Sequence, residues 1–117
     1  ADALRGFMED MERIGRADDV AIMVFTEFGR RVAENASKGT DHGTATPMYI
    51  IGKKVKGGFY GTFPSLTDLD NGNLKMTTDF RSVYGTMLDQ WMGFSQTAEV
   101  LKGDFPTLDV VHEEGRV

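Results

Sequence analysis

The chain has 117 residues, of which 40% are hydrophobic and 26% are charged, and its formal net charge is -5 at pH 7. This balance is typical of a folded globular domain and excludes a disordered chain. The negative charge argues against nucleic acid as a partner, and no apolar run approaches the roughly 20 residues that span a bilayer. The absence of cysteine excludes disulfides and thiolate chemistry.

The first two predicted elements are an amphipathic helix and a buried strand. Residues 2–15 carry apolar side chains at helical spacing, and Gly15 stands where a helix is expected to end. The apolar face consists of Leu4, Phe7, Met8, Met11 and Ile14. Residues 20–25 then form a continuous apolar run, which predicts a strand that is covered on both faces.

The next stretch leads to a second strand. Residues 27–34 are compatible with one or two helical turns, and residues 35–46 are predicted to be a loop because they are rich in small polar residues. Residues 48–51 predict a second buried strand. Strands of this kind need partners on both edges, and two are too few for a sheet. We therefore expect the missing strands from the remainder of a larger chain or from a homo-oligomer partner.

The second half of the chain is predicted to be a loop followed by helices. Residues 52–64 are rich in glycine and lysine and predict a long exposed loop or a short irregular hairpin, and the Asn-Gly pair at 71–72 predicts a tight turn. Thr77-Thr78-Asp79 is expected to supply the N-cap and the first-turn acid of a helix over residues 80–92. Residues 97–101 predict a short helix, and the last residues a tail. The sequence shows no internal repeat and no domain boundary.

Acidic and imidazole side chains flank the two predicted strands. Glu27 follows the first strand directly, and Asp41-His42 lies in the loop that leads to the second. Ligands of open α/β sheets bind at such strand ends, and carboxylate and imidazole groups are common ligands of divalent metals. Two structural alternatives stay open. Glu27 suits the first turn of a helix, and Asp41-His42 suits a solvated loop turn.

Three cationic residues, Arg30, Arg31 and Lys38, surround these groups. Cations beside a metal are suited to hold a phosphate or sulfate group. The alternative is a solvated helix face, which is the better interpretation for at least one of the two arginines.

Four short sequence motifs of the chain resemble, in the same order, motifs of a known family. They are Phe25-Thr26-Glu27-Phe28-Gly29-Arg30, Gly39-Thr40-Asp41-His42-Gly43, Gly57-Gly58-Phe59-Tyr60-Gly61 and Thr78-Asp79-Phe80-Arg81-Ser82-Val83-Tyr84. With them the chain resembles the C-terminal part of domain-of-unknown-function family 1501, a bacterial group in the alkaline-phosphatase/sulfatase-like superfamily. The resemblance extends from the first helix to about Phe105.

This resemblance implies an α/β fold, a three-layer αβα sandwich of the alkaline-phosphatase-like type. Residues 1–117 would be the C-terminal portion of one such domain. Divalent metals bind at the C-terminal edge of the superfamily's sheet, so Zn, Mn or Ca is the expected ion. The nucleophile and a first metal carboxylate would lie upstream of Ala1. Family members often begin with a twin-arginine signal, which implies export to the periplasm.

The resemblance also implies roles for individual residues. Relatives such as the cofactor-independent phosphoglycerate mutases carry Thr-x-Asp-His-Gly after a strand, and residues 26–29 are similar to that word. Glu27 then stands for the metal-binding Asp, and Phe28 stands where the His would be and cannot bind a metal. His42 resembles a further ligand that precedes a strand. A second alignment places Asp41-His42 on the Asp-His-Gly word, but that word should follow its strand at once.

Together these assignments predict a site and a reaction. Glu27 and His42 would bind the metal, and Asp41 would be a ligand or would orient His42. Arg30 and Lys38 would contact a small phosphate or sulfate ester. The expected function is metal-dependent hydrolysis of that ester. The alternative is a non-catalytic, degenerate member that serves in binding or assembly.

Overall fold

The computed structural model describes residues 1–116, in which a first helix is followed by a run of short strands and then by further helices. The helices are α1 (Asp2–Arg13), α2 (Phe80–Thr86) and α3 (Thr97–Leu101), with the 3-10 turns η1 (Ala17–Asp19) and η3 (Glu113–Gly115) and the π-helix η2 (Met87–Trp91). The strands are β1 (Ala21–Val24), β2 (Gly29–Glu34), β3 (Thr40–Gly43), β4 (Tyr49–Gly52), β5 (Leu69–Asp70) and β6 (Asn73–Leu74). The described residues form antiparallel pairs of β1 with β4, β2 with β3, and β5 with β6.

The first four strands make one long hairpin. β1 pairs with β4, and beyond them Arg30 of β2 pairs with His42 of β3. The prediction of helical turns at residues 27–34 is therefore wrong, because β2 occupies most of that stretch. The prediction of a loop at residues 35–46 is wrong where β3 lies. In both places cross-strand hydrogen bonding satisfies the backbone and outweighs weak local preferences.

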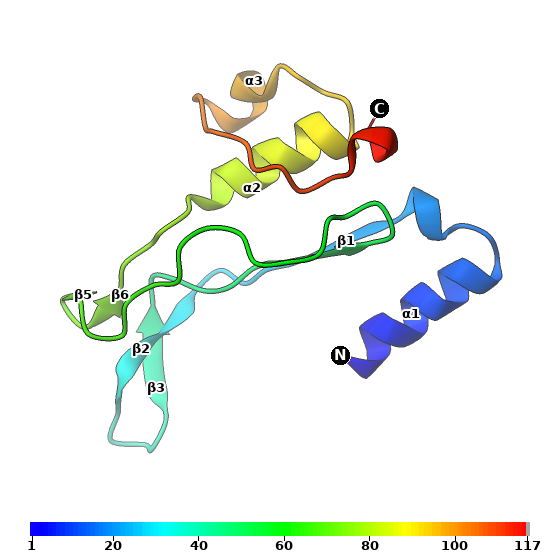
Figure 1. Cartoon of the computed structure of the whole chain (residues 1–117). Coiled ribbons are helices and arrows are strands. Elements are labelled where there is room, and N and C mark those ends of the chain that lie inside the picture. Colours follow the sequence, from blue (N-terminus) through cyan, green and yellow to red (C-terminus); the bar gives the residue numbers. More distant parts are fainter. Residues whose placement is uncertain (117) are drawn as a thin grey trace.

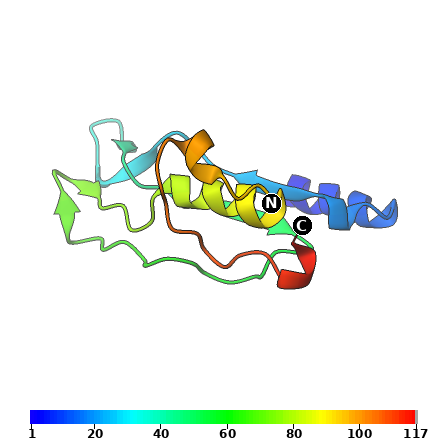
Figure 2. The same cartoon turned by 90° about the horizontal axis from the view of Figure 1, so that it is seen from above.

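Helices lie on both sides of this hairpin. α2 and η2 run along one side of the β1–β4 pair, and α1 lies on the other (Figure 1). The view from above shows β5 and β6 at one end of the molecule and α1 at the opposite end (Figure 2). The guanidinium of Arg31 on β2 donates to the carbonyl of Asn71 in the β5–β6 turn. Arg31 thus joins β2 to the β5–β6 turn.

The buried side chains come mainly from α2, η2 and the C-terminal segment. They belong to Ala17, Ser82, Val83, Thr86, Gln90, Val110 and Val111. The backbone N–H of Leu108 donates to the Thr86 hydroxyl at 2.9 Å, and that of Val111 donates to Gln90 Oε1 at 3.1 Å. Val111 also bridges to Val55. The prediction of a C-terminal tail is therefore wrong, because side-chain hydrogen bonds from the helix hold this segment in the core.

Other local predictions are confirmed. Gly15 takes a φ of 75° just after α1, and Asn71 and Gly72 take φ values of 50° and 82° in the β5–β6 turn. The side chain of Asp79 caps α2 by accepting from the backbone N–H of Arg81 at 2.9 Å. α3 covers residues 97–101 as predicted. No helix among residues 1–116 combines the length and the apolar character needed to cross a membrane.

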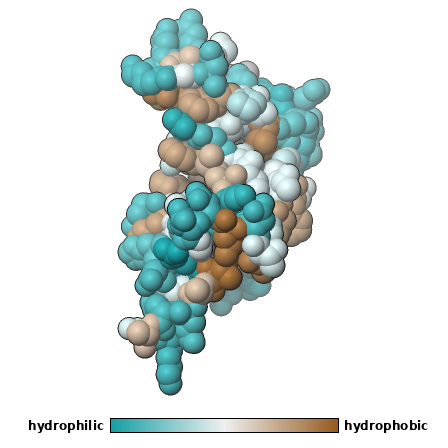
Figure 3. All heavy atoms as spheres, turned by 90° about the vertical axis from the view of Figure 1, so that its left-hand side faces the viewer, coloured by the Kyte–Doolittle hydropathy of each residue, from teal (hydrophilic) through white to brown (hydrophobic). Residues whose placement is uncertain are grey.

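The described chain has more surface than its length requires. It exposes 8337 Å², about 2,000 Å² more than a compact protein of this size. Its radius of gyration is 16.7 Å, against about 13 Å for a compact chain. Hydrophobic residues lie on the surface in Figure 3, and Phe59 and Phe63 are almost fully exposed. The fold is mixed α/β with two-stranded sheets, and residues 1–116 show no three-layer sandwich.

The two strands predicted to be covered on both faces are only half-buried, and α1 has no buried residue. These elements therefore carry more apolar surface than the other described residues cover.

Candidate functional site

Two of the sequence motifs, residues 25–30 and 39–43, lie opposite each other where the hairpin passes from the β1–β4 pair to the β2–β3 pair. Gly29 pairs with Gly43, and Arg30 pairs with His42. A Cβ on Gly29 would lie 1.7 Å from the carbonyl oxygen of Ala45, and a Cβ on Gly43 would lie 2.7 Å from the carbonyl carbon of Arg30. Only glycine allows the backbones to approach this closely. The two glycines therefore fix the register that places Arg30 opposite His42.

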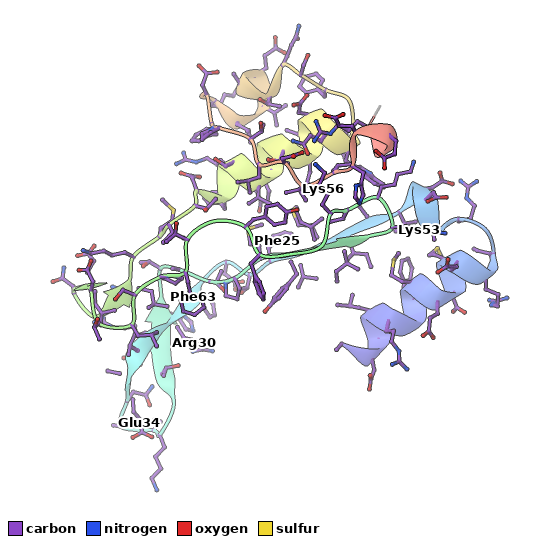
Figure 4. All side chains as sticks on the ribbon, in the orientation of Figure 1. Phe25, Arg30, Glu34, Lys53, Lys56 and Phe63 are labelled. Atoms are coloured by element: carbon purple, nitrogen blue, oxygen red, sulfur yellow. The ribbon has the colours of Figure 1, made fainter. Side chains whose placement is uncertain are left out.

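The imidazole of His42 stacks on the phenyl ring of Phe28. The ring centroids are 3.6 Å apart and the planes differ by 14°. The guanidinium carbon of Arg30 lies 5.4 Å from the Phe28 centroid, and Arg30 Nη1 donates to the carbonyl of Thr40 at 2.9 Å. Figure 4 shows Arg30 near the junction and Glu34 toward the far end of the hairpin. Phe28, Arg30 and His42 thus form one group on the hairpin, which we call the junction cluster.

Glu27 lies next to this cluster and is exposed. Its own backbone N–H, the Thr26 hydroxyl at 3.1 Å and the positive potential of His42 together lower the pKa of the Glu27 carboxyl, with the backbone contribution largest. The carboxyl is therefore ionised at neutral pH, which is the form that binds a metal. Glu27 directly precedes Phe28, on whose ring His42 stacks, so the two predicted ligands lie in the same stretch of the hairpin.

The other two predicted residues, Asp41 and Lys38, lie farther toward the tip of the β2–β3 hairpin. The Asp41 carboxylate accepts from the side-chain amide of Asn35 at 3.0 Å, and Asp41 and His42, as adjacent strand residues, point to opposite faces. Lys38 is exposed in the turn at the hairpin tip with a φ of 61°. At about 3.3 Å per residue, this turn lies more than about 13 Å along the strand from Arg30.

The chemistry of the donors fits a divalent metal, but their number does not complete a site. Zinc in proteins is bound by at least three side chains, and residues 1–116 contain no group of three or more His, Asp or Glu side chains that could hold a metal ion. Glu27 and His42 supply two donors. Any further ligands would have to come from residues beyond those described.

Sequence reasoning missed the contact between Phe28 and His42. One feature of the sequence is consistent with it: Phe28 and Arg30 are two residues apart, so in an extended strand their side chains lie on the same face. The contact itself depends on the pairing of Arg30 with His42. Helical turns at residues 27–34 and a loop at residues 35–46 contain no such pairing.

A family model described as "Protein of unknown function (DUF1501)" matches residues 1–105 of the chain. All four of the sequence motifs fall within the matched residues. Neither a curated protein nor a solved structure matches the chain.

Proposed function

Because the chain belongs to the DUF1501 family of proteins of unknown function, we propose that its function resides at the junction cluster and the adjoining Glu27. The proposed activity is metal-dependent hydrolysis of a small phosphate or sulfate ester. In this proposal residues 1–116 supply one part of a composite site, and the chain is the C-terminal portion of an alkaline-phosphatase-like domain.

One observation carries this proposal. Glu27, an exposed carboxylate, follows β1 and directly precedes Phe28, and the exposed imidazole of His42 on β3 stacks on that phenyl ring. Neither ring nitrogen of His42 makes a hydrogen bond or a short ion pair within the described residues, so both are open to a ligand. Carboxylate and imidazole together are a donor pair for Zn²⁺ or Mn²⁺.

Each of the site residues has a separate role in this proposal. Glu27 and His42 would hold the ion, which when bound supplies charge stabilisation to the ester oxygens. Arg30 keeps further guanidinium N–H groups beyond the one given to Thr40, and these can donate to an ester oxyanion. Asp41, held by Asn35, would support the β3 strand from its other face. Lys38 would meet a substrate only if that substrate extended to the hairpin tip.

The partner in this proposal is the remainder of a larger chain or a second copy. The support is the surplus surface of about 2,000 Å² and the apolar residues that lack cover. Within the described residues β1 pairs only with β4, so its other edge is available to a further strand. Helices on opposite sides of the β1–β4 pair are what a sandwich layer would require.

Metal content of the natural protein, isolated without chelator, tests the proposal. We expect stoichiometric Zn, Mn or Ca that falls sharply in Glu27→Ala and in His42→Ala. Two matched controls are Glu34→Ala, an exposed carboxylate farther along β2, and His112→Ala, the second histidine of the chain. Neither control should lose metal. Equal loss in the controls and the site variants would contradict the assignment of Glu27 and His42.

The alternative is a non-catalytic, degenerate member that serves in binding or assembly. The observation that favours it is the two-donor set, together with Phe28 at the place of a metal-binding histidine. The alternative gains if the natural protein holds no stoichiometric metal and Glu27→Ala leaves its metal content and esterase activity unchanged.

A further inference from the structure

The contact between Phe28 and His42 is closer and more nearly parallel than ordinary aromatic packing. The centroids are 3.6 Å apart with an interplanar angle of 14°, whereas neutral aromatic pairs prefer offset or edge-to-face arrangements at about 4.5–7 Å. The face of a phenyl ring is electron-rich and attracts a ring that carries positive charge. An imidazole that is bound to a metal or protonated is such a ring.

The backbone holds both rings in this arrangement. Gly29 lies between Phe28 and Arg30, and its pairing with Gly43 brings the two strands together. The Arg30 guanidinium lies against the same phenyl ring at 5.4 Å and is tied to β3 through the Thr40 carbonyl. Phe28 therefore cannot move away from His42 without breaking contacts on both strands.

The stack leaves the reactive edge of His42 open. Both imidazole nitrogens lie in the ring plane, so a phenyl ring on the face covers carbon atoms and π-density and blocks neither nitrogen. The side chain of His42 is otherwise exposed and would sample several rotamers. Holding the ring in one plane reduces the entropy that a ligand must remove on binding.

From these contacts we propose that Phe28 is a positioning residue, which fixes the plane of the His42 imidazole and leaves its ring nitrogens open to a ligand. The inference rests on the proposed function for its metal ligand. Phe28 touches neither the metal nor the substrate and acts through His42 alone.

Nuclear magnetic resonance of the natural protein, labelled with ¹³C-histidine, tests the arrangement without any metal. A histidine that lies over a phenyl ring has its ring protons displaced upfield by the ring current. We expect this displacement for His42, assigned with the His42→Asn variant, and its loss in Phe28→Leu. Phe28→Tyr keeps an aromatic face and should retain it. Phe25→Leu is the matched control, because Phe25 packs on Tyr84 at 6.0 Å rather than on His42.

Titration of the same variants with Zn²⁺ and Mn²⁺ tests the consequence. An aromatic stacking contribution of 0.5–1.5 kcal/mol corresponds to an affinity about 2- to 12-fold weaker in Phe28→Leu, with Phe28→Tyr and Phe25→Leu close to the wild type. Absence of the upfield displacement in the wild type would overturn the proposal, as would metal binding by wild type and Phe28→Leu with the same measurable affinity. If the displacement is present and lost in Phe28→Leu but no variant binds metal, the positioning stands and the proposed hydrolase function fails.

Discussion

The side-chain amide of Gln90 makes three hydrogen bonds to the C-terminal segment. Replacement of Gln90 by methionine should therefore weaken the attachment of this segment to the helix. Gln90 is only 6% exposed. Its Nε2 donates to the carbonyl of Leu108 at 2.5 Å, and its Oε1 accepts from the backbone N–H groups of Val110 at 3.2 Å and Val111 at 3.1 Å. Methionine has a similar volume, so Gln90→Met removes these hydrogen bonds and little of the packing.

The expected cost follows from the groups left without partners. The residues Val110 and Val111 are 2% and 0% exposed, so water does not readily replace the lost acceptor. The segment cannot easily turn, because the Val110 carbonyl accepts from the Lys56 N–H at 2.7 Å. Each buried polar group left unpaired costs about 1–3 kcal/mol. Two N–H groups and one carbonyl, with partial relaxation, give about 3–6 kcal/mol, a large fraction of a typical net stability of about 5–15 kcal/mol.

Hydrogen exchange of the Val110 and Val111 amides measures this free energy locally. A loss of about 3–6 kcal/mol speeds their exchange by about 10²- to 10⁴-fold when exchange follows opening. The matched control is Gln96→Met, at an exposed glutamine before α3, which should leave both rates unchanged. Exchange within about threefold of the wild type in Gln90→Met would refute the reasoning, because the amide would then carry little of the segment's stability.

Three further predictions concern the hairpin, a helix cap and the free surface. Gly29→Ala should destabilise the protein by about 3 kcal/mol in chemical denaturation, because its Cβ would meet the Ala45 carbonyl, whereas Gly57→Ala, with open space around the Cβ, should be neutral. The guanidinium of Arg81 holds the pKa of Asp79 at about 2, below its usual 3.8; this contribution is complete above about pH 4 and is lost as the pH falls through about 2. Helical circular dichroism should therefore decline less between pH 4 and 2 in Asp79→Asn than in the wild type, and equal declines would contradict the assignment. The isolated 117-residue chain should self-associate through open strand edges, and a stable monomer at high concentration in light scattering would exclude this.

Elements that depend on neighbours in the sequence were predictable. The Asp79 cap, the Asn71-Gly72 turn and the helix at residues 97–101 each rest on groups only a few residues apart. The residue types indicate the local geometry directly, because a carboxylate at a helix N-cap and a glycine with a positive φ in a turn favour the same local structure in any fold.

Elements that depend on distant partners were not predictable in the same way. The sequences of strands β2 and β3 are rich in residues such as Gly, Thr and Asp that are typical of loops. They form strands because the two segments hydrogen-bond to each other. The C-terminal segment similarly has no strong pattern of its own. Thr86 and Gln90 hold it in place from 18 to 22 residues away in the sequence.

The sequence by itself determined the local elements, the family and the presence of Glu27 and His42 as a carboxylate and an imidazole beside two strands. Tertiary structure alone decided how these groups meet. The antiparallel register set by Gly29 and Gly43 brings Phe28 onto His42, while it sends Asp41 to the other face of the strand. The physical reason is that helices and caps form from contacts within one turn, whereas a cross-strand contact exists only once two distant backbones have paired.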